Sequence, residues 1–296
     1  MNVDSIQINL GDGDLFLMNI CLALLMFGIA LDMKLEDFKR VVSFPKSAVV
    51  GLTSQLVLLP IWTLIIIWFF NPIASIALGM ILISVCPGGN ISNFAVFLGK
   101  GNTALSITLT SIVTLMAIFI TPLTFPFWAS FVPSTEGLMA EISVDAWSMI
   151  KIIFQLILVP LIIGMAINAK WGFKITKLKK IMKVLSILIF LGFIIFALAK
   201  NVKEIQDYLG IVFLLVLLHN GVAMIIGYYF AALNKLPVPD RKAISLETGI
   251  QNGGLGLILI FNFFPNLGGM ILVAAWWGIW DMASSLLVAS YWSRNS

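Results

Sequence analysis

The chain has 296 residues, of which 60% are hydrophobic and only 11% are charged. About a quarter of the residues in a soluble domain are charged, so this composition excludes an ordinary soluble fold and predicts an all-α membrane protein. The formal net charge of +4 does not indicate nucleic-acid binding, because the basic residues lie between apolar runs, and the two cysteines supply neither a disulfide framework nor a metal cluster.

Nine apolar segments are expected to cross the bilayer, because each is long enough for about 30 Å of hydrocarbon. The first follows an acidic N-terminus that lacks the basic region of a signal peptide, which favours a retained span. The predicted spans are 14–31, 45–69, 73–98, 103–128, 147–169, 180–200, 209–233, 241–265 and 268–293.

The basic residues alternate between the connections. Fifteen of the eighteen lysines and arginines fall after the first, third, fifth and seventh spans or in the C-terminal tail. The 129–146 connection, on the other side, carries three acidic residues and no basic one. Because cytoplasmic loops are enriched in Lys and Arg, we expect a multi-pass protein of the cytoplasmic membrane with its N-terminus outside and its C-terminus in the cytoplasm.

Two spans are interrupted by polar, helix-breaking sequence. The third contains CPGGNISN at 86–93, and the eighth contains ETGIQNGG at 247–254, about 160 residues later. The same shift carries spans one to four onto spans six to nine in the opposite orientation. We therefore predict an inverted repeat within one transmembrane domain, with repeat one over 14–128, a linking span over 147–169 and repeat two over 180–293.

Interrupted helices at corresponding positions of an inverted repeat are typical of secondary transporters that bind their substrate near the midplane. The alternative is that Gly and Pro are merely common in membrane helices. That alternative leaves the clustered Asn, Ser, Gln and Glu residues at the same two places unexplained.

Glu247 and Asp281 are the two acidic residues expected deep in the membrane. A charge there is costly and normally serves a bound partner or a pathway. The neighbouring donors are neutral oxygens, which suit a small monovalent cation such as Na+ better than zinc, copper or a divalent ion. A proton carried by Glu247 is the alternative. The expected donors are Gln55, Ser92, Asn93, Ser106, Thr110, Thr248, Gln251 and Asn252.

Several of these residues also have ordinary structural explanations. Ser106 and Thr110 share a helix face, and each hydroxyl can bond to the carbonyl four residues earlier. Gln55 can form a hydrogen bond between helices, and Glu247 can bond to neighbouring hydroxyls. His219 is more simply explained as a packing and hydrogen-bonding residue than as a ligand.

A broken helix also presents free amides with a positive partial charge at the start of its second half. Such amides attract carboxylates and similar anions. A cation held by Glu247 beside them favours co-transport of Na+ with an organic anion.

Taken together, the motifs resemble the bile acid:sodium symporter family over nearly the whole chain. The two break motifs and their spacing are the most specific part of the resemblance. The residues that carry it are MFGIAL at 26–31, Gln55 with Pro60, CPGGNISN at 86–93, KGN at 100–102, LS at 105–106, LHNG at 218–221 and LETGIQN at 246–252. The resemblance implies a nine-helix form in which two crossing broken helices and their neighbours make a core domain, and the remaining helices make a panel domain.

The resemblance also implies two sodium sites. The first donor set comprises Ser92, Asn93, Ser106, Thr110 and Glu247. The second donor set comprises Gln55, Glu247, Thr248, Ile250 through its carbonyl, and Gln251. The implied substrate-facing positions are Asn90, Ile91 and Asn252 at the helix crossing and Asp281 in the last span.

At 280–282 this chain reads Trp-Asp-Met where bacterial relatives often read Trp-His-Asn. An acid at this position repels a carboxylate or sulfonate, which favours small organic anions over bile acids. The expected function is sodium-coupled symport of an organic anion, bile-acid-like or a smaller carboxylate, by alternating access. The alternatives are proton-coupled or uncoupled transport and a channel or sensor; an enzyme is not expected, because the spans contain no nucleophile–base pair.

Overall fold

The structure is a computed structural model and describes residues 12–31, 33–34, 36, 43, 45–89, 91–141, 146–182, 184–185, 188, 192 and 202–294. Within these ranges the chain forms helices and no strand, which confirms the all-α prediction. The sole β-type contact that these residues make is an isolated antiparallel bridge between Gly88 and Gln251.

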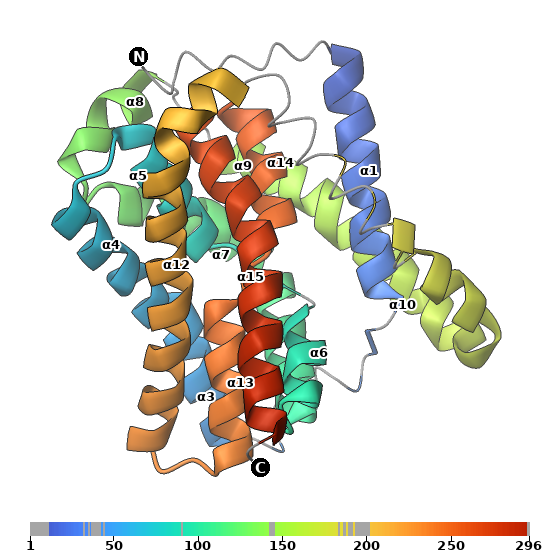
Figure 1. Cartoon of the computed structure of the whole chain (residues 1–296). Helices are drawn as coiled ribbons and strands as arrows, with labels where there is room; N and C mark the ends of the chain where they lie inside the picture. The colour runs from blue at the N-terminus through green and yellow to red at the C-terminus, as the bar shows by residue number, and fades with distance from the viewer. Residues whose placement is uncertain are drawn as a thin grey trace.

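Figure 1 shows how the helices follow one another along the chain. The first half holds α1 (Asp12–Ala30), α3 (Pro45–Thr53), the π-helix η3 (Ser54–Leu58), α4 (Leu59–Phe70), α5 (Ala74–Ser84), α6 (Ile91–Leu98) and α7 (Thr103–Ala129). A connection follows with the 3-10 helix η4 (Pro133–Thr135) and α8 (Glu136–Glu141). The second half holds α9 (Ala146–Ile153), the π-helix η5 (Phe154–Leu158), α10 (Val159–Trp171), the 3-10 helix η6 (Gly172–Ile175), α12 (Val202–Leu233), α13 (Val238–Gly249), α14 (Gly253–Phe263) and α15 (Gly268–Arg294).

Five of the described helical segments are long and apolar enough to cross a membrane, and the chain is therefore a multi-pass membrane protein. They are Pro45–Phe70, Thr103–Ala129, Trp147–Trp171, Tyr208–Leu233 and Gly268–Arg294. The predicted first span corresponds to α1, and the third and eighth are each divided into two shorter helices. Most of the predicted sixth span, 180–200, lies outside the described residues, so the count of nine spans stays a prediction.

Both breaks are shorter than the sequence motifs predict. The first lies between α5 and α6, which begins at Ile91, so Ser92 and Asn93 are helical. The second covers only 250–252, because α13 continues through Glu247 to Gly249. At the first break Pro87, which lacks an N–H group, prevents the helix from continuing. At the second break α14 begins after Asn252, whose side chain accepts a hydrogen bond from the Leu255 amide at 2.9 Å.

The two breaks cross and satisfy each other's backbone. The Gly89 amide donates to the Ile250 carbonyl at 3.3 Å, and the Asn252 amide donates to the Pro87 carbonyl at 2.8 Å. Hydrocarbon offers no hydrogen-bond partner, so a non-helical backbone at membrane depth needs such pairing.

Both π-helices come just before a proline in similar sequence. Gln55 begins QLVLLP in η3 and α4, and Gln155 begins QLILVP in η5 and α10. A proline in a continuous helix removes one hydrogen bond and crowds the carbonyl four residues earlier, and the wider π turn accommodates it. Gln55 is buried, whereas Gln155 is exposed.

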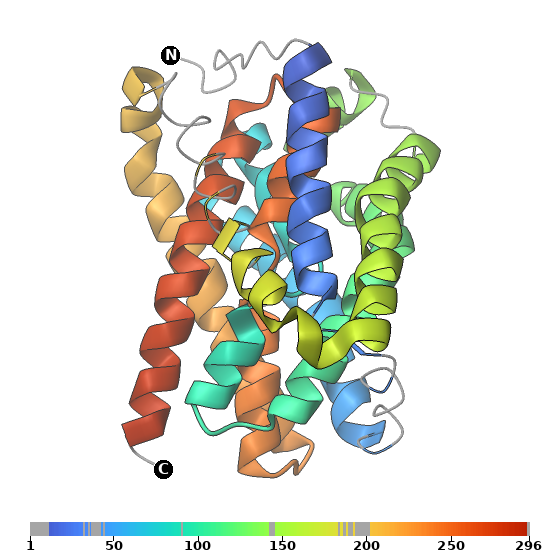
Figure 2. The same cartoon turned by 90° about the vertical axis from the view of Figure 1, so that its right-hand side faces the viewer.

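In both views α1 lies beside α10, and in Figure 1 both lie on the other side of α15 from α12 (Figures 1 and 2). The largest buried apolar cluster draws most of its residues from α5, α14 and α15, and it also includes Met26 of α1 and Ile153 of α9. Trp277 is its largest fully buried side chain. α1 also contacts α14 through Asn19, whose side-chain amide exchanges hydrogen bonds of 3.2 and 2.9 Å with that of Asn262.

Candidate functional site

Glu247 lies at the centre of a buried polar cluster next to the crossing. It is 1% exposed, and its Oε1 accepts hydrogen bonds from the Ser92 and Ser106 hydroxyls, each at 2.5 Å. The Thr110 hydroxyl lies 2.9 Å from Oε2. Three elements that are distant in the sequence, α6, α7 and α13, therefore converge on one carboxylate.

Asn93 completes the first donor set. Its Oδ1 lies 2.8 Å from the Ser106 hydroxyl, which can donate its single proton either to Asn93 or to Glu247, and 3.3 Å from the Thr110 hydroxyl. The bond from Thr110 to the Ser106 carbonyl is also present at 3.1 Å, so the ordinary back-bond and the contact with Glu247 coexist. The structure brings together all five residues of this set.

Three members of the second donor set, Gln55, Glu247 and Ile250, approach one point beside Gly88, and two of the set's side-chain amides are incompletely hydrogen-bonded. Gln55 is 1% exposed, and neither its Oε1 nor its Nε2 has a hydrogen-bond partner. The interhelical bond considered for Gln55 is thus not formed. Gln251 donates from Nε2 to the Thr248 carbonyl at 3.1 Å, while its Oε1 is buried without a partner. The Thr248 hydroxyl is 2.7 Å from both the Ser54 hydroxyl and the Ile244 carbonyl, which leaves its own carbonyl as the group facing this set.

Gly88 keeps a small space open between these groups. A Cβ atom on Gly88 would lie 3.0 Å from Gln55 Nε2, 3.2 Å from Glu247 Oε2 and 3.7 Å from the Ile250 carbonyl oxygen. Side chains from η3 and α13 and a carbonyl from the second break thus surround one point. Turning the Gln55 amide by 180° would bring its oxygen to the same point.

The donor types fit a hard cation such as Na+. Buried unpartnered amides cost about 1–3 kcal/mol each, and a cation among them would satisfy the oxygens and balance the Glu247 charge. Elsewhere in the described part of the chain, no three His, Cys, Asp or Glu side chains gather in a way that could hold a metal.

The predicted substrate positions are less completely described. Asn90 lies outside the described residues. Ile91 is half-buried at the start of α6, and Asn252 caps α14. Asp281 is buried on α15, one turn beyond Gly278, which packs closely against Gly253 at the start of α14. The N-terminal ends of two half-helices and the middle of α15 therefore lie near the crossing.

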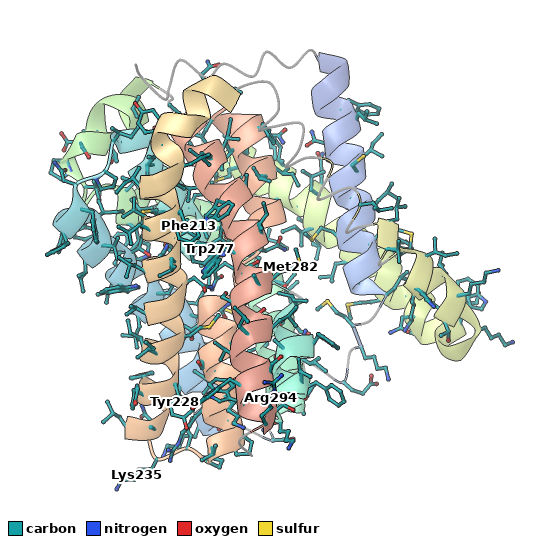
Figure 3. The ribbon with its side chains drawn as sticks, viewed as in Figure 1. Phe213, Tyr228, Lys235, Trp277, Met282 and Arg294 are labelled. Atoms are coloured by element: carbon teal, nitrogen blue, oxygen red, sulfur yellow. The ribbon has the colours of Figure 1, made fainter. Side chains whose placement is uncertain are left out.

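Asn220 is a site residue that the sequence reasoning did not identify. Its Nδ2 donates to the Gly249 carbonyl at 2.7 Å, next to the second break, and its Oδ1 is buried without a partner. The signal was present, because Asn220 and His219 are adjacent polar residues in an apolar span. His219 itself bonds to Thr63 at 2.6 Å and packs on Trp277, which lies between α12 and α15 (Figure 3).

Residues 19–208 match the Sodium Bile acid symporter family. The chain is 31% identical over 277 residues to the "Uncharacterized sodium-dependent transporter YocS" of Bacillus subtilis (strain 168), covering 93% of this chain and 83% of that protein. It is 26% identical over 247 residues to the "Probable sodium/metabolite cotransporter BASS1, chloroplastic" of Arabidopsis thaliana, covering 83% of this chain and 59% of that protein. It is 30% identical over 279 residues to "Probable sodium/metabolite cotransporter BASS3, chloroplastic" of Oryza sativa subsp. japonica, covering 92% of this chain and 62% of that protein.

These three relatives are named as transporters and not as enzymes. The chain spans about three-fifths of the length of the two chloroplast proteins. The family match ends at residue 208, before Glu247 and the second break.

Proposed function

This chain belongs to the Sodium Bile acid symporter family, and from that premise we propose that it is a sodium-coupled symporter of an organic anion. Its relatives include a sodium-dependent transporter of Bacillus subtilis and a probable sodium/metabolite cotransporter of Arabidopsis thaliana. The activity itself is transport across the bilayer and not chemical conversion.

The arrangement of donors on the two sides of Glu247 carries the proposal. Oε1 accepts hydrogen bonds from hydroxyls of the first donor set, and Oε2, which the Thr110 hydroxyl also approaches, borders the space beside Gly88 together with Gln55 and the Ile250 carbonyl. We assign one sodium ion to each set. Ser92, Asn93, Ser106, Thr110 and Glu247 would hold one ion, and Gln55, Glu247, Thr248, Ile250 and Gln251 would hold the other.

The proposed architecture is a single domain of nine spans, built as an inverted repeat of 14–128 and 180–293 around a linking span at 147–169. The mutual pairing of the two breaks supports this relation. The group formed by α1 and α10 corresponds to the panel, and the group around α5, α13, α14 and α15 corresponds to the core. The basic connections would face the cytoplasm and the N-terminus the outside.

Transport would proceed by alternating access. Sodium binding would neutralise Glu247 and give Gln55 and Gln251 partners, which would hold the crossing in one arrangement. The core would then move against the panel and expose the site to either side. Each sodium ion entering down about 100 mV contributes about 2.3 kcal/mol, and two ions double this driving force.

The substrate would bind at the start of α6 and α14, where free amides attract an anion. Asn90, Ile91 and Asn252 would form this end of the site, with Asp281 opposite on α15. A carboxylate at 281 disfavours a second carboxylate or sulfonate close to it. A small organic anion is therefore the preferred substrate class, and bile-acid-like anions are the bulkier alternative.

The first test is the thermal stability of the purified protein in NaCl, KCl and LiCl at equal ionic strength. A ligand that binds only the folded state raises stability by RT ln(1 + [L]/Kd). We expect a sodium-specific rise that Glu247→Ala abolishes and Glu136→Ala, a change on the short helix α8, leaves intact. A wild-type protein that responds equally to all three salts would contradict sodium coupling. Stabilisation by acid without a sodium effect would instead support the proton-coupled alternative.

A further inference from the structure

A groove lies between α12 and α15 and shares Asn220 with the surroundings of the second break. Its volume is about 660 Å³. In Figure 1, α1 and α10 lie beyond the other side of α15. We call it the α12–α15 groove. Its lining residues are Leu217, Asn220, Gly221, Met224, Ile225, Tyr228, Tyr229, Ser245, Trp280, Ser284, Leu287, Val288 and Trp292.

Aromatic contacts bound the groove at both ends. Near one end the rings of Phe213 and Trp280 are 5.7 Å apart, and near the other the rings of Tyr228 and Trp292 are 5.9 Å apart. On α12 the lining runs from Leu217 to Tyr229, which at about 1.5 Å per residue is about 18 Å. That length is close to one leaflet of a hydrocarbon core of about 30 Å.

The two ends of the groove differ in character. Its middle is lined by aliphatic side chains, and Leu287 on its rim is 66% exposed, so it opens sideways towards the bilayer. At the Tyr228 end the buried Lys242 ammonium donates to the Gly99 carbonyl at 2.9 Å and lies 5.7 Å from the centre of the Trp292 ring. Arg294 ends α15 at the same end of the molecule (Figure 3). Among the described lining residues, none is acidic.

We propose that the α12–α15 groove binds one acyl chain of an anionic phospholipid, with the phosphate headgroup beside Arg294. The chain fills the largely apolar middle of the groove, the tyrosine and tryptophan rings lie at the interfacial depth they favour, and the Arg294 guanidinium matches the headgroup charge. The length of one leaflet and the sideways opening fit a lipid, whereas the site at the helix crossing is the place for a transported anion.

The floor of the groove belongs to the helix that carries Glu247. The Ser245 hydroxyl donates to the Met224 carbonyl at 2.7 Å, and Asn220 holds the Gly249 carbonyl, so α12 and α13 are joined directly beneath the lipid site. A bound acyl chain therefore stabilises the packing of α12, α13 and α15 against one another. Lipid binding is expected to raise the stability of the folded protein.

Two glycines of α12 allow a matched test. A Cβ atom would meet nothing within 4 Å at either Gly221, which lines the groove, or Gly210, which lies outside it. Gly221→Leu therefore adds a side chain inside the groove from a position with room for its Cβ atom, and Gly210→Leu is the same change elsewhere on the helix. The measurement is thermal unfolding in detergent with phosphatidylglycerol or phosphatidylcholine of identical chains, together with the number of bound lipids by native mass spectrometry.

For wild type and Gly210→Leu, phosphatidylglycerol should raise the unfolding midpoint by about 3 °C or more above phosphatidylcholine. Gly221→Leu should lose that difference and retain one phosphatidylglycerol fewer. Arg294→Gln should reduce the preference for phosphatidylglycerol. Should Gly221→Leu fail to fold, Ile225→Trp on the groove rim replaces it. Equal stabilisation by the two lipids, or an undiminished difference in the groove-filling variant, would overturn the proposal.

Discussion

On one side of Glu247 the hydroxyls of Ser92 and Ser106 donate to the carboxylate at 2.5 Å, whereas on the other side the Gln55 amide is buried without a partner. The same carboxylate thus borders a complete hydrogen-bond network and an incomplete one. The polar atoms of the first donor set satisfy one another. Those of the second donor set leave Gln55 and the Gln251 oxygen for something else to satisfy.

The difference indicates how each side depends on a bound cation. On the first side a cation must replace hydrogen bonds that already exist, so its net gain is small. On the second side a cation supplies interactions that are otherwise missing, because a buried unpaired amide costs about 1–3 kcal/mol. We therefore expect the second donor set to contribute most of the sodium-dependent stabilisation.

The largest effect should come from Glu247→Gln, which removes the charge that both sides share. Removing one partner of a buried charged pair costs about 3–5 kcal/mol, or about 100-fold or more in affinity. We expect sodium-driven uptake into proteoliposomes to fall at least to that extent. Glu136→Gln, on α8, is the control and should transport normally. Sodium-driven uptake at the wild-type level by Glu247→Gln would remove the shared carboxylate from the mechanism.

Gln55→Leu should preserve or raise the stability of the sodium-free protein but weaken its stabilisation by sodium. Without sodium the variant should be as stable as wild type or more stable by about 1 kcal/mol, because an unpartnered buried amide is gone. Its sodium-induced rise in unfolding temperature should nevertheless fall to less than half. Gln155→Leu alters the matching residue of the exposed π-helix and should change neither quantity. A Gln55→Leu protein that is destabilised in potassium would show that its amide has a partner.

Without sodium, Ser106→Ala should destabilise the protein, which is the opposite of the effect expected for Gln55→Leu. It removes donors to Glu247 and Asn93, so the free energy of unfolding should drop by about 1–2 kcal/mol even in potassium. Urea unfolding in potassium measures this directly. Thr108→Val on the same helix removes a hydroxyl that bonds to the Ala104 carbonyl and is the comparison for losing a buried hydroxyl. Equal losses in both variants would mean that the first donor set forms no special network.

Asn220→Ala should have the smallest effect of the four. It leaves the Gly249 carbonyl without its 2.7 Å bond but removes no predicted ligand. A loss of about 1 kcal/mol corresponds to about a fivefold weaker sodium affinity, measured by titrating the thermal shift. Asn220→Ser tests whether a shorter donor restores part of the affinity. An unchanged sodium affinity in Asn220→Ala would show that α12 does not influence cation binding by the second donor set.

The sequence predicted the crossing region well where the cause is local. Pro87 stops a helix for a local reason and, although Gly253 and Gly254 of the second motif belong to α14, both breaks were predicted. Their lengths were overestimated, because Ser92 and Thr248 are as compatible with a helical turn as with a loop. The donor residues came from the polar side chains in the spans, and their division into two sets came from the family resemblance. The structure brings the first set together around Glu247.

Other parts of the site depend on tertiary contacts that no local pattern contains. The space at Gly88 exists only because η3 and the second break approach it from elsewhere in the chain. Asn220 takes its position from a carbonyl on another helix. A polar residue in an apolar span signals that a partner exists, but not which one. The inverted repeat and the span count still rest on the sequence pattern, since most of 180–200 is outside the described residues.

The pairing of the two breaks has a consequence for the order in which the protein is made. The Gly89 amide and the Pro87 carbonyl find their partners at Ile250 and Asn252, about 160 residues later in the chain. During synthesis the first break therefore enters the bilayer with backbone groups that nothing yet satisfies. Only when the last quarter of the chain has been inserted can the crossing close. Until the crossing closes, water or the insertion machinery should supply hydrogen-bond partners for the backbone of the first break.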